Sequence, residues 1–257
     1  APEADEDRAA YYDRAVSRLG WCIKNFGGYQ KKIMRDVFFE AFETYETGCA
    51  PVSQELARGV APERQTQLLG RAAAAMLDEL EAGWQKKGDM EDEKIVLAIF
   101  FVPMVRKQQL PISEEFVTIL QKQWVERYPK SPFYLGDYES ISGGFRKKFL
   151  GLCFITTAVC QELGKPDDCE ELTAFRAFRD GYLRSQPDGE ALIREYYNIA
   201  PGIVTCINTC SDRHASYARI REEYLAPCYQ DLLAGRNESC KARYVRMVRD
   251  LEREYLS

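Results

Sequence analysis

Apolar residues recur at helical spacing along almost the whole chain, and this pattern constrains the fold more than any other feature. Within residues 5–26, Tyr11, Ala15, Leu19 and Cys22 are separated by three or four positions, so they share one face of an α-helix. The alternation of period two that marks half-buried strands is absent. The sequence therefore predicts an all-α fold, a multi-helix bundle of about nine to eleven helices with at most trivial strand content.

Glycine and proline mark the predicted ends of these helices, because one favours a left-handed turn and the other lacks a backbone donor. We expect Pro51 to follow the end of one helix, Pro103 to bend or break another and Pro201 to interrupt a third. The expected helices cover residues 5–26, 29–47, 62–88, 91–108, 113–128, 145–163 and 169–184, and they continue from Asp188, from Ala215 and from Glu238.

One long stretch breaks the helical pattern. Residues 128–144, YPKSPFYLGDYESISGG, contain two prolines and three glycines and show no apolar period, which is typical of a loop. The break predicts two helical halves, an N-terminal half at 1–128 and a C-terminal half at 145–257, joined by an irregular connection at 129–144.

Charge and hydropathy exclude two classes of partner. The 257 residues carry 35 basic and 40 acidic side chains, a net charge of −5, so the basic field that nucleic-acid binding needs is missing. The longest apolar runs, 95–105 and 151–159, are far shorter than the roughly 20 residues that span a bilayer. We expect no nucleic-acid partner and no membrane-spanning segment.

The nine cysteines are odd in number and irregular in spacing, and several lie inside helical patterns. Such cysteines are typical of reduced thiols in a bacterial cytoplasm rather than of a disulfide framework. The chain begins at Ala1 with the acidic APEADED, which is compatible with removal of a signal peptide, a tag or a larger parent chain.

The segment 153–160, CFITTAVC, carries two thiols and two hydroxyls but no charge. We interpret it as the apolar centre of a buried helix, in which Thr156 and Thr157 return their hydroxyls to carbonyls one turn back. Cys153 and Cys160 are then core thiols about 10 Å apart along that helix. Their protonated form should be favoured, because burial disfavours the thiolate.

Two chemical alternatives use the only imidazole of the chain, His214. Cys206, Cys210 and His214 are spaced one helical turn apart and are weak candidates for a metal site, since no C-x-x-C pattern accompanies them. Cys153 or Cys160 acting as a nucleophile would need His214 as its base. We expect neither arrangement, and we expect no cofactor.

The strongest polar constellation is the FRAFRD of residues 175–180. Arg176 and Asp180 are four positions apart, so a regular helix would bring them together beside Arg179. A surface ion pair of this kind contributes little to stability. The alternative is a guanidinium pair that binds a carboxylate or phosphate, assisted by Tyr196 or Tyr197.

CFITTAVC, the LTAFRAFRDGYL of 172–183 and the GEALIREYYNIAP of 189–201 follow one another in this order. Together they resemble the C-terminal CFI-box module of bacterial proteins, which reads CFIATA, then an LRxFRD helix, then a glycine-led segment ending in YYxxSP. The resemblance covers residues 153–207, roughly a fifth of the chain. Thr156 replaces the usual alanine, Val159-Cys160 replaces a Tyr-Gly, and 165–169 is an insertion, which suggests a clostridial-type variant. The resemblance implies an architecture and no activity.

These observations favour a bacterial binding or protein-interaction module over an enzyme, with an unknown protein or a small anionic molecule as its partner. The alternative is a small enzyme or ligand-sensing domain that uses the second-half cysteines and the FRxFRD arginines to bind an anionic small molecule. A pocket containing Arg176, Arg179 and a tyrosine would favour this alternative, whereas a broad exposed apolar face would favour the interaction module.

Overall fold

The computed structural model describes residues 2–146 and 153–257. Throughout these two ranges it is all-α, with helices joined by turns and short irregular segments and without strands. The predicted fold class is therefore confirmed. None of the described helices combines the length and the apolar character required to cross a membrane.

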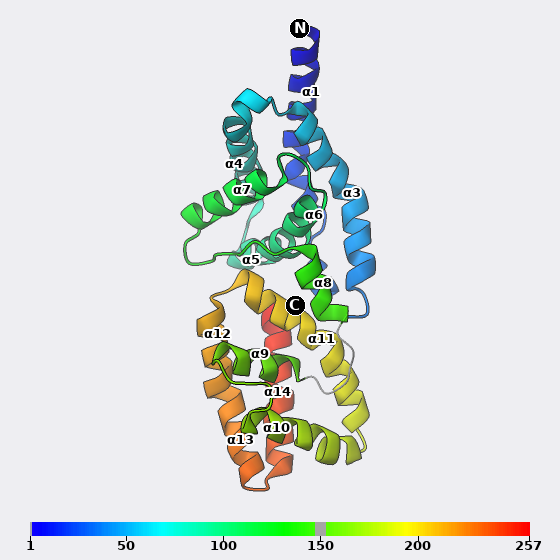
Figure 1. Cartoon of the computed structure of the whole chain (residues 1–257), viewed down its shortest axis with the longest axis vertical. Helices are drawn as coiled ribbons and strands as arrows, with labels where there is room; N and C mark the ends of the chain where they lie inside the picture. The colour runs from blue at the N-terminus through cyan, green and yellow to red at the C-terminus, as the bar shows by residue number, and fades with distance from the viewer. Residues whose placement is uncertain (1, 147–152) are drawn as a thin grey trace. The chain divides into compact units, whose positions relative to one another are not determined.

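The chain divides into two compact units (Figure 1). Unit 1 consists of residues 1–30 and 39–142, and unit 2 consists of residues 31–38 and 143–257. The short segment 31–38 belongs to unit 2 although most of unit 1 follows it in the chain. It is held there by a hydrogen bond of 2.9 Å from the Arg35 amide to the Asn198 carbonyl. Gly202 makes this approach possible, because a Cβ at that position would lie 1.8 Å from the Ile33 carbonyl oxygen.

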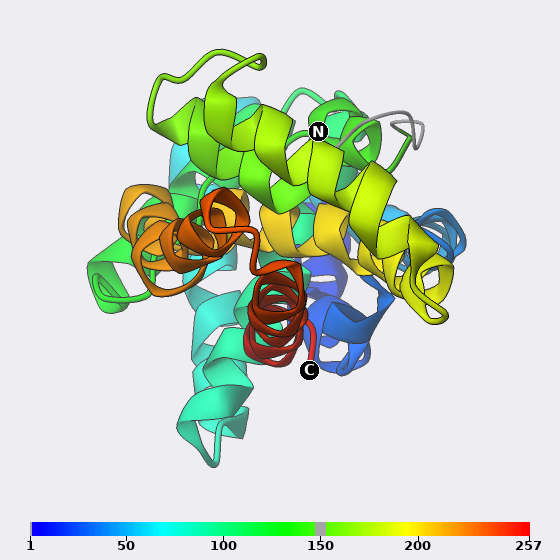
Figure 2. The same cartoon turned by 90° about the horizontal axis from the view of Figure 1, so that it is seen from below.

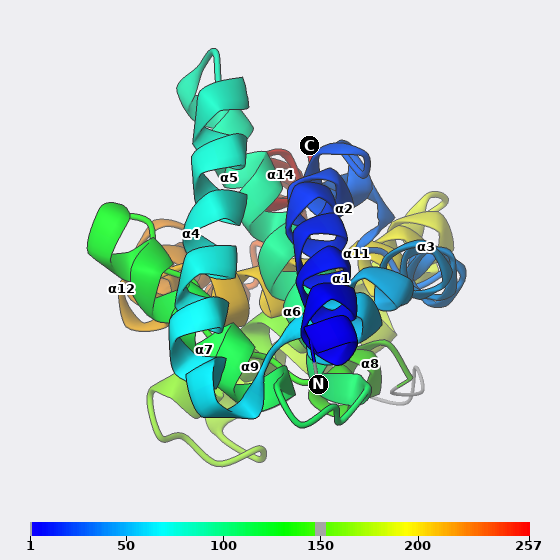
Figure 3. The same cartoon turned by 90° about the horizontal axis from the view of Figure 1, so that it is seen from above.

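Unit 1 is built around long helices with buried aromatic side chains. Its α4 packs against α1 and α7 (Figure 3). Trp124 of α7 is fully buried, and its indole donates a hydrogen bond of 2.7 Å to the Ser131 carbonyl. This bond fixes the irregular chain after α7 against the core. The helices are α1 Pro2–Leu19, α2 Trp21–Lys24, α3 Phe38–Gly59, α4 Gln65–Gly83, α5 Lys87–Val96, α6 Val102–Lys107 and α7 Ser113–Arg127, and α8 Tyr138–Arg146 spans the division between the units.

Unit 2 is a bundle in which α11 packs against both α9 and α14. In Figure 2, α14 is seen nearly end-on beside α13, its antiparallel neighbour. Buried Asp231 of α13 accepts hydrogen bonds from Ser239 and Arg243 of α14 and from Arg236 in the turn between them. These bonds, Ser239 foremost, lower the pKa of Asp231. The helices are α9 Phe154–Glu162, α10 Glu170–Ala177, α11 Gly189–Cys210, α12 Arg213–Ile220, α13 Ala226–Leu233 and α14 Asn237–Tyr255.

Among the described helices, three contain a π-helical segment, at Leu97–Phe101, Phe178–Leu183 and Arg221–Leu225. The first and third lie just before Pro103 and Pro227, whose missing amides leave the carbonyl four residues earlier without its usual donor. A wider turn accommodates that loss. The irregularity expected near Pro103 is thus observed as a π-segment. The second lies in the FRAFRD region and has no proline.

Several predicted helix boundaries were wrong. The helix expected at 5–26 is interrupted at Gly20, and the one expected at 29–47 begins as a 3₁₀ turn before α3 starts at Phe38. Pro51 and Pro201, expected to end or interrupt helices, lie inside α3 and α11. One proline costs a helix about 3 kcal/mol, and burial of a long apolar face offsets this cost. The connection expected to be irregular at 129–144 is helical from Tyr138.

Candidate functional site

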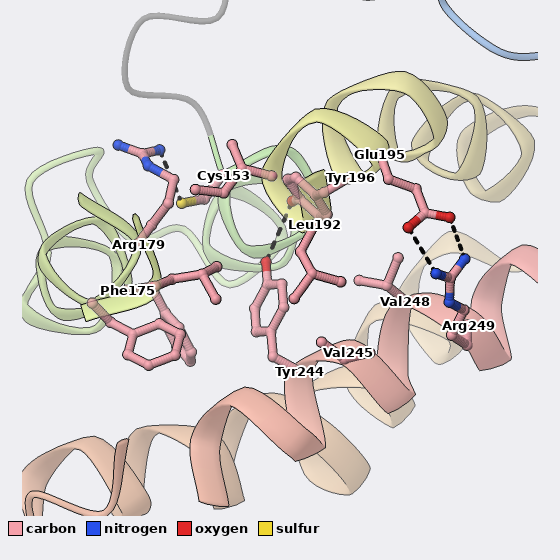
Figure 4. A pocket seen from close by; sticks show the side chains of 13 residues that line it. Cys153, Phe175, Arg179, Leu192, Glu195, Tyr196, Tyr244, Val245, Val248 and Arg249 are labelled. Carbon is pink, nitrogen blue, oxygen red and sulfur yellow. Dashed lines mark hydrogen bonds and ion pairs between the residues drawn. The ribbon is translucent and has the colours of Figure 1, made fainter. Parts of the chain in front are cut away.

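A pocket lies inside unit 2, between the beginning of α9, α10 with the π-segment 178–183, α11 and α14. Its empty space, which includes volume open to solvent, is about 630 Å³. The walls are almost entirely apolar. Figure 4 shows the Cys153–Arg179 pair at one end and the Glu195–Arg249 pair at the other. The apolar walls are formed by Phe175, Phe178, Leu183, Leu192, Val245 and Val248.

The close approach of α11 to the π-segment shapes one wall. Gly189 begins α11 and is buried, and a Cβ there would lie 1.8 Å from the Leu183 carbonyl oxygen. Glycine is therefore required for α11 to start at this place. As a result Leu183 and Leu192, which flank the turn, both line the pocket.

Tyrosine hydroxyls close the pocket at the N-terminus of α9. The Tyr196 oxygen accepts a hydrogen bond of 2.9 Å from the Ile155 amide, one of the helix-terminal amides that have no partner within the helix. Tyr244 of α14 donates to the same oxygen at 3.4 Å, and its own oxygen lies 3.1 Å from the Thr156 hydroxyl. Burial raises the pKa of Tyr196 and of Tyr244, so both phenols keep their protons at neutral pH.

Arg179 is buried, and its guanidinium is already engaged. Its Nε and Nη2 donate to the two carboxylate oxygens of Asp180 at 2.8 and 2.7 Å. Its Nη1 donates to the Tyr197 hydroxyl at 3.1 Å and lies 3.6 Å from the Cys153 sulfur. These contacts, led by the hydrogen bonds to Asp180, raise the pKa of Arg179 and lower the pKa of Asp180.

The expected pairing of Arg176 with Asp180 was wrong. Arg176 instead donates to the Asp167 carboxylate at 2.8 Å and to its carbonyl at 2.7 Å. Asp180 lies inside the π-helical segment Phe178–Leu183, where its carboxylate accepts from Arg179 and lies 3.6 Å from Arg184. Arg176 and Tyr197 are not among the pocket-lining residues, whereas Arg179 and Tyr196 are.

Cys153 was expected inside a helix that began at Phe145, but α9 begins at Phe154 and Cys153 precedes it with a non-helical backbone. Residues 147–152 lie outside the described part of the chain. Cys153, Thr156 and Cys160 are buried as expected, while Thr157 is half-buried. Burial raises the pKa of Cys153, and the neighbouring Arg179, which the sequence did not suggest, only partly offsets that effect. The raised pKa agrees with the expectation that burial favours the protonated form of the Cys153 thiol.

The hydroxyls of the motif do not behave as predicted. Thr156 is directed to Tyr244 rather than to a carbonyl one turn back. The Thr157 oxygen is buried and has no hydrogen-bond partner among the described residues. The Thr156 hydroxyl therefore depends on α14 for its polar contact.

The three weak metal candidates are not gathered into a ligand set. Cys206 of α11 directs its thiol to the Tyr255 carbonyl at 3.8 Å, and Cys210 is buried on the same helix. His214, which is largely exposed, pairs with Glu162 at the end of α9. Within 2–146 and 153–257, no three His, Cys, Asp or Glu side chains are arranged to hold a metal ion.

Sequence reasoning missed the contribution of α14. Tyr244 and Val248 lie on the buried stripe of that helix, and the stripe could have been found from the spacing of Cys240, Tyr244, Val248 and Leu251. Glu195 of α11 and Arg249 of α14 form a two-bond ion pair at the pocket edge, with Nη2 2.7 Å from Oε2. No local signal links these two residues, because 54 positions separate them.

Comparison with known proteins gives no match, either to a family model, to a curated protein or to a solved structure.

Proposed function

We propose that unit 2 binds a small, predominantly apolar and uncharged molecule that carries one hydrogen-bond acceptor. The observation that carries this proposal is the composition of the pocket, whose walls are almost entirely apolar. Burial of apolar surface supplies most of the affinity in such a site, and a few polar groups orient the ligand.

The preference for an uncharged ligand follows from the two arginines that line the pocket. Arg179 is held by both carboxylate oxygens of Asp180, and Arg249 is held by both oxygens of Glu195. An anionic ligand would have to compete with a carboxylate that is already in place. This argues against the anionic molecule that the FRxFRD motif suggests.

Tyr196 supplies the group that would recognise an acceptor. Its oxygen accepts from Ile155, and its contact with the Tyr244 hydroxyl is long, at 3.4 Å, so a ligand oxygen at normal hydrogen-bond distance would be the better acceptor of its proton. Because burial raises its pKa, the phenol remains a donor. A carbonyl or ether oxygen of the ligand is the matching partner.

The rival role, a protein-interaction module, finds less support. The exposed large apolar side chains of the described residues are Trp21 and Tyr134 in unit 1 and Leu163 and Leu233 in unit 2. With two in each unit, they do not make the broad apolar face that an interaction surface would need.

Displacement of N-phenylnaphthylamine, an uncharged dye that emits in apolar surroundings, tests the proposal. Leu192 and Val245 are half-buried at the pocket, so Leu192→Trp and Val245→Trp should fill it and abolish the emission. Leu233→Trp, on an exposed position outside the pocket, is the matched control and should leave the emission unchanged. Dye binding that survives both pocket substitutions would refute the site.

Competition then tests the ligand chemistry. Decane, methyl decanoate and decanoate share one chain and differ in the end group. We expect the ester to displace the dye best, and we expect Tyr196→Phe to remove its advantage over decane. Displacement by decanoate at lower concentration than the ester would show that the site selects an anion.

A further inference from the structure

Cys160 and Cys169 lie side by side at the junction of α9 and α10. Cys160 is in the last turn of α9, and Cys169 immediately precedes α10. Their sulfur atoms are 3.8 Å apart, with the Cys169 thiol directed at the Cys160 sulfur. Only the short segment 161–168 separates them, and it reverses direction at Gly164, whose φ is +67°.

The two thiols differ in exposure. All nine cysteines lie in the described part of the chain, and Cys169 is the one that is partly exposed, whereas Cys160 is 3% exposed. Two other pairs, Cys22–Cys49 and Cys228–Cys240, are also in mutual contact. All four of those cysteines are fully buried, so a solvent oxidant cannot reach either pair in the folded state.

We propose that Cys160 and Cys169 are a redox-active dithiol, which a low-molecular-weight disulfide such as oxidised glutathione converts into an intramolecular disulfide. The accessible Cys169 sulfur attacks one sulfur of the oxidant, and a mixed disulfide forms while one molecule of reduced glutathione leaves with a proton. Cys160 then attacks the Cys169 sulfur, the second glutathione leaves with the Cys160 proton, and the protein disulfide remains. Two thiols are oxidised and one glutathione disulfide is reduced to two thiols.

The geometry allows the second step with a small movement. A disulfide needs about 2.05 Å between sulfurs, so the two atoms must approach by less than 2 Å from their present separation. Cys169 has an extended backbone, with ψ of 153°, and its carbonyl accepts the first helical hydrogen bond of α10, from the Thr173 amide at 3.0 Å. Rotation about its Cα–Cβ bond moves the sulfur and leaves that hydrogen bond in place.

The order of attack also follows from the surroundings. Burial raises the pKa of Cys160, and the adjacent Cys169 sulfur acts in the same direction. Cys160 is consequently a poor first nucleophile, and it resolves a disulfide that has already formed at its neighbour. The proposal is independent of ligand binding in the pocket.

The test is treatment of the native protein with oxidised glutathione, followed by alkylation, digestion and mass spectrometry. Trypsin leaves Cys160 and Cys169 in one peptide because Lys165 precedes a proline. A protease that cuts before aspartate separates them at Asp167. The peptide 137–166 also contains Cys153, so the bridge is assigned by a linked peptide pair whose fragment spectrum places the alkyl group on Cys153. We expect the 160–169 link to appear, with the loss of two hydrogens, and to disappear on treatment with dithiothreitol.

Two variants define the roles of the sulfurs. Cys160→Ser should accumulate a stable glutathione adduct on Cys169, because the resolving thiol is missing. Cys169→Ser should leave Cys160 unmodified, because Cys160 is buried. The Cys22–Cys49 pair is the internal control and should oxidise at least about tenfold more slowly, since it reacts only after local opening.

Two results would overturn the proposal. One is a lasting glutathione adduct on Cys169 in the native sequence with Cys160 still free, which would show that the sulfurs do not meet. The other is formation of the 22–49 link at the same rate as the 160–169 link, which would show oxidation of an unfolded population.

Discussion

Replacing Tyr196 with phenylalanine removes a single oxygen atom on which the start of α9 depends. That oxygen accepts the Ile155 amide at 2.9 Å, and Ile155 is fully buried. Without it the amide loses its acceptor in a site that water does not readily enter. Tyr244 also loses an acceptor but keeps its contact with Thr156. Leaving one buried amide unsatisfied costs about 1–3 kcal/mol, so we expect a loss near the middle of that range.

The matched control is Tyr182→Phe, which removes the same atom from a tyrosine whose hydroxyl donates to Glu238 at the surface. Its effect on the free energy of unfolding should stay within about 0.5 kcal/mol. Both substitutions remove one phenolic oxygen, but Tyr196→Phe removes the acceptor of a buried amide, whereas Tyr182→Phe removes a donor to a surface carboxylate.

Urea unfolding provides the assay. The tryptophans, Trp21, Trp84 and Trp124, are all in unit 1, so their emission follows unit 1 while far-UV circular dichroism follows both units. For a slope near 2 kcal/mol per molar urea, a loss of about 2 kcal/mol lowers the unfolding midpoint by roughly 1 M. The shift should appear in the circular dichroism signal of Tyr196→Phe. A midpoint no lower than that of Tyr182→Phe would refute the role of Tyr196 as the cap of α9.

Two further predictions are tested by urea unfolding, and a third is tested by alkylation of cysteines. Gly189→Ala should destabilise unit 2 by about 1–3 kcal/mol through the clash with the Leu183 carbonyl, whereas Gly181→Ala, with open space at its Cβ, should be neutral or stabilising by up to about 1 kcal/mol. Asp231→Asn should destabilise at neutral pH. Because the folded-state pKa of Asp231 is lowered, its contribution is present above the ordinary carboxyl pKa of about 3.9 and is lost as pH falls through the folded value, so the gap between variant and parent should close in acid. In the native protein, Cys153 should react with iodoacetamide far more slowly than Cys169, whereas in urea the two rates should be similar. Cys153→Ala should lower the free energy of unfolding only slightly. Rapid labelling of Cys153 in the native protein would favour the enzyme interpretation.

Helical segments were predictable because their signal is local. The stripe of apolar residues in α4 and the period of α7 each place one face of a helix against a core, whatever the rest of the chain does. The burial of Cys153, Thr156 and Cys160 followed from the same reasoning. Helix ends were predicted less well, since packing of long helices offset the effect of Pro51 and Pro201.

The pocket shows where local reasoning stops. The sequence singled out Arg179 and Tyr196, and both line the pocket. The spacing of apolar residues could place Tyr244 on a buried stripe, but it could not show that its hydroxyl contacts that of Tyr196, 48 positions away. The spacing of Arg176 and Asp180 also predicted an ion pair on a regular helix, whereas in the structure the Asp180 carboxylate accepts two hydrogen bonds from Arg179.

The amino-acid sequence alone thus determined that the chain is helical and which faces of its helices are buried, because the spacing of apolar residues is a property of neighbouring positions. The tertiary structure alone decided which polar groups meet. The pairing of Arg179 with Asp180, the contact of Tyr196 with Tyr244 and the approach of Cys169 to Cys160 depend on how helices pack and where they widen. Packing is set by the whole unit at once, and no short segment carries it.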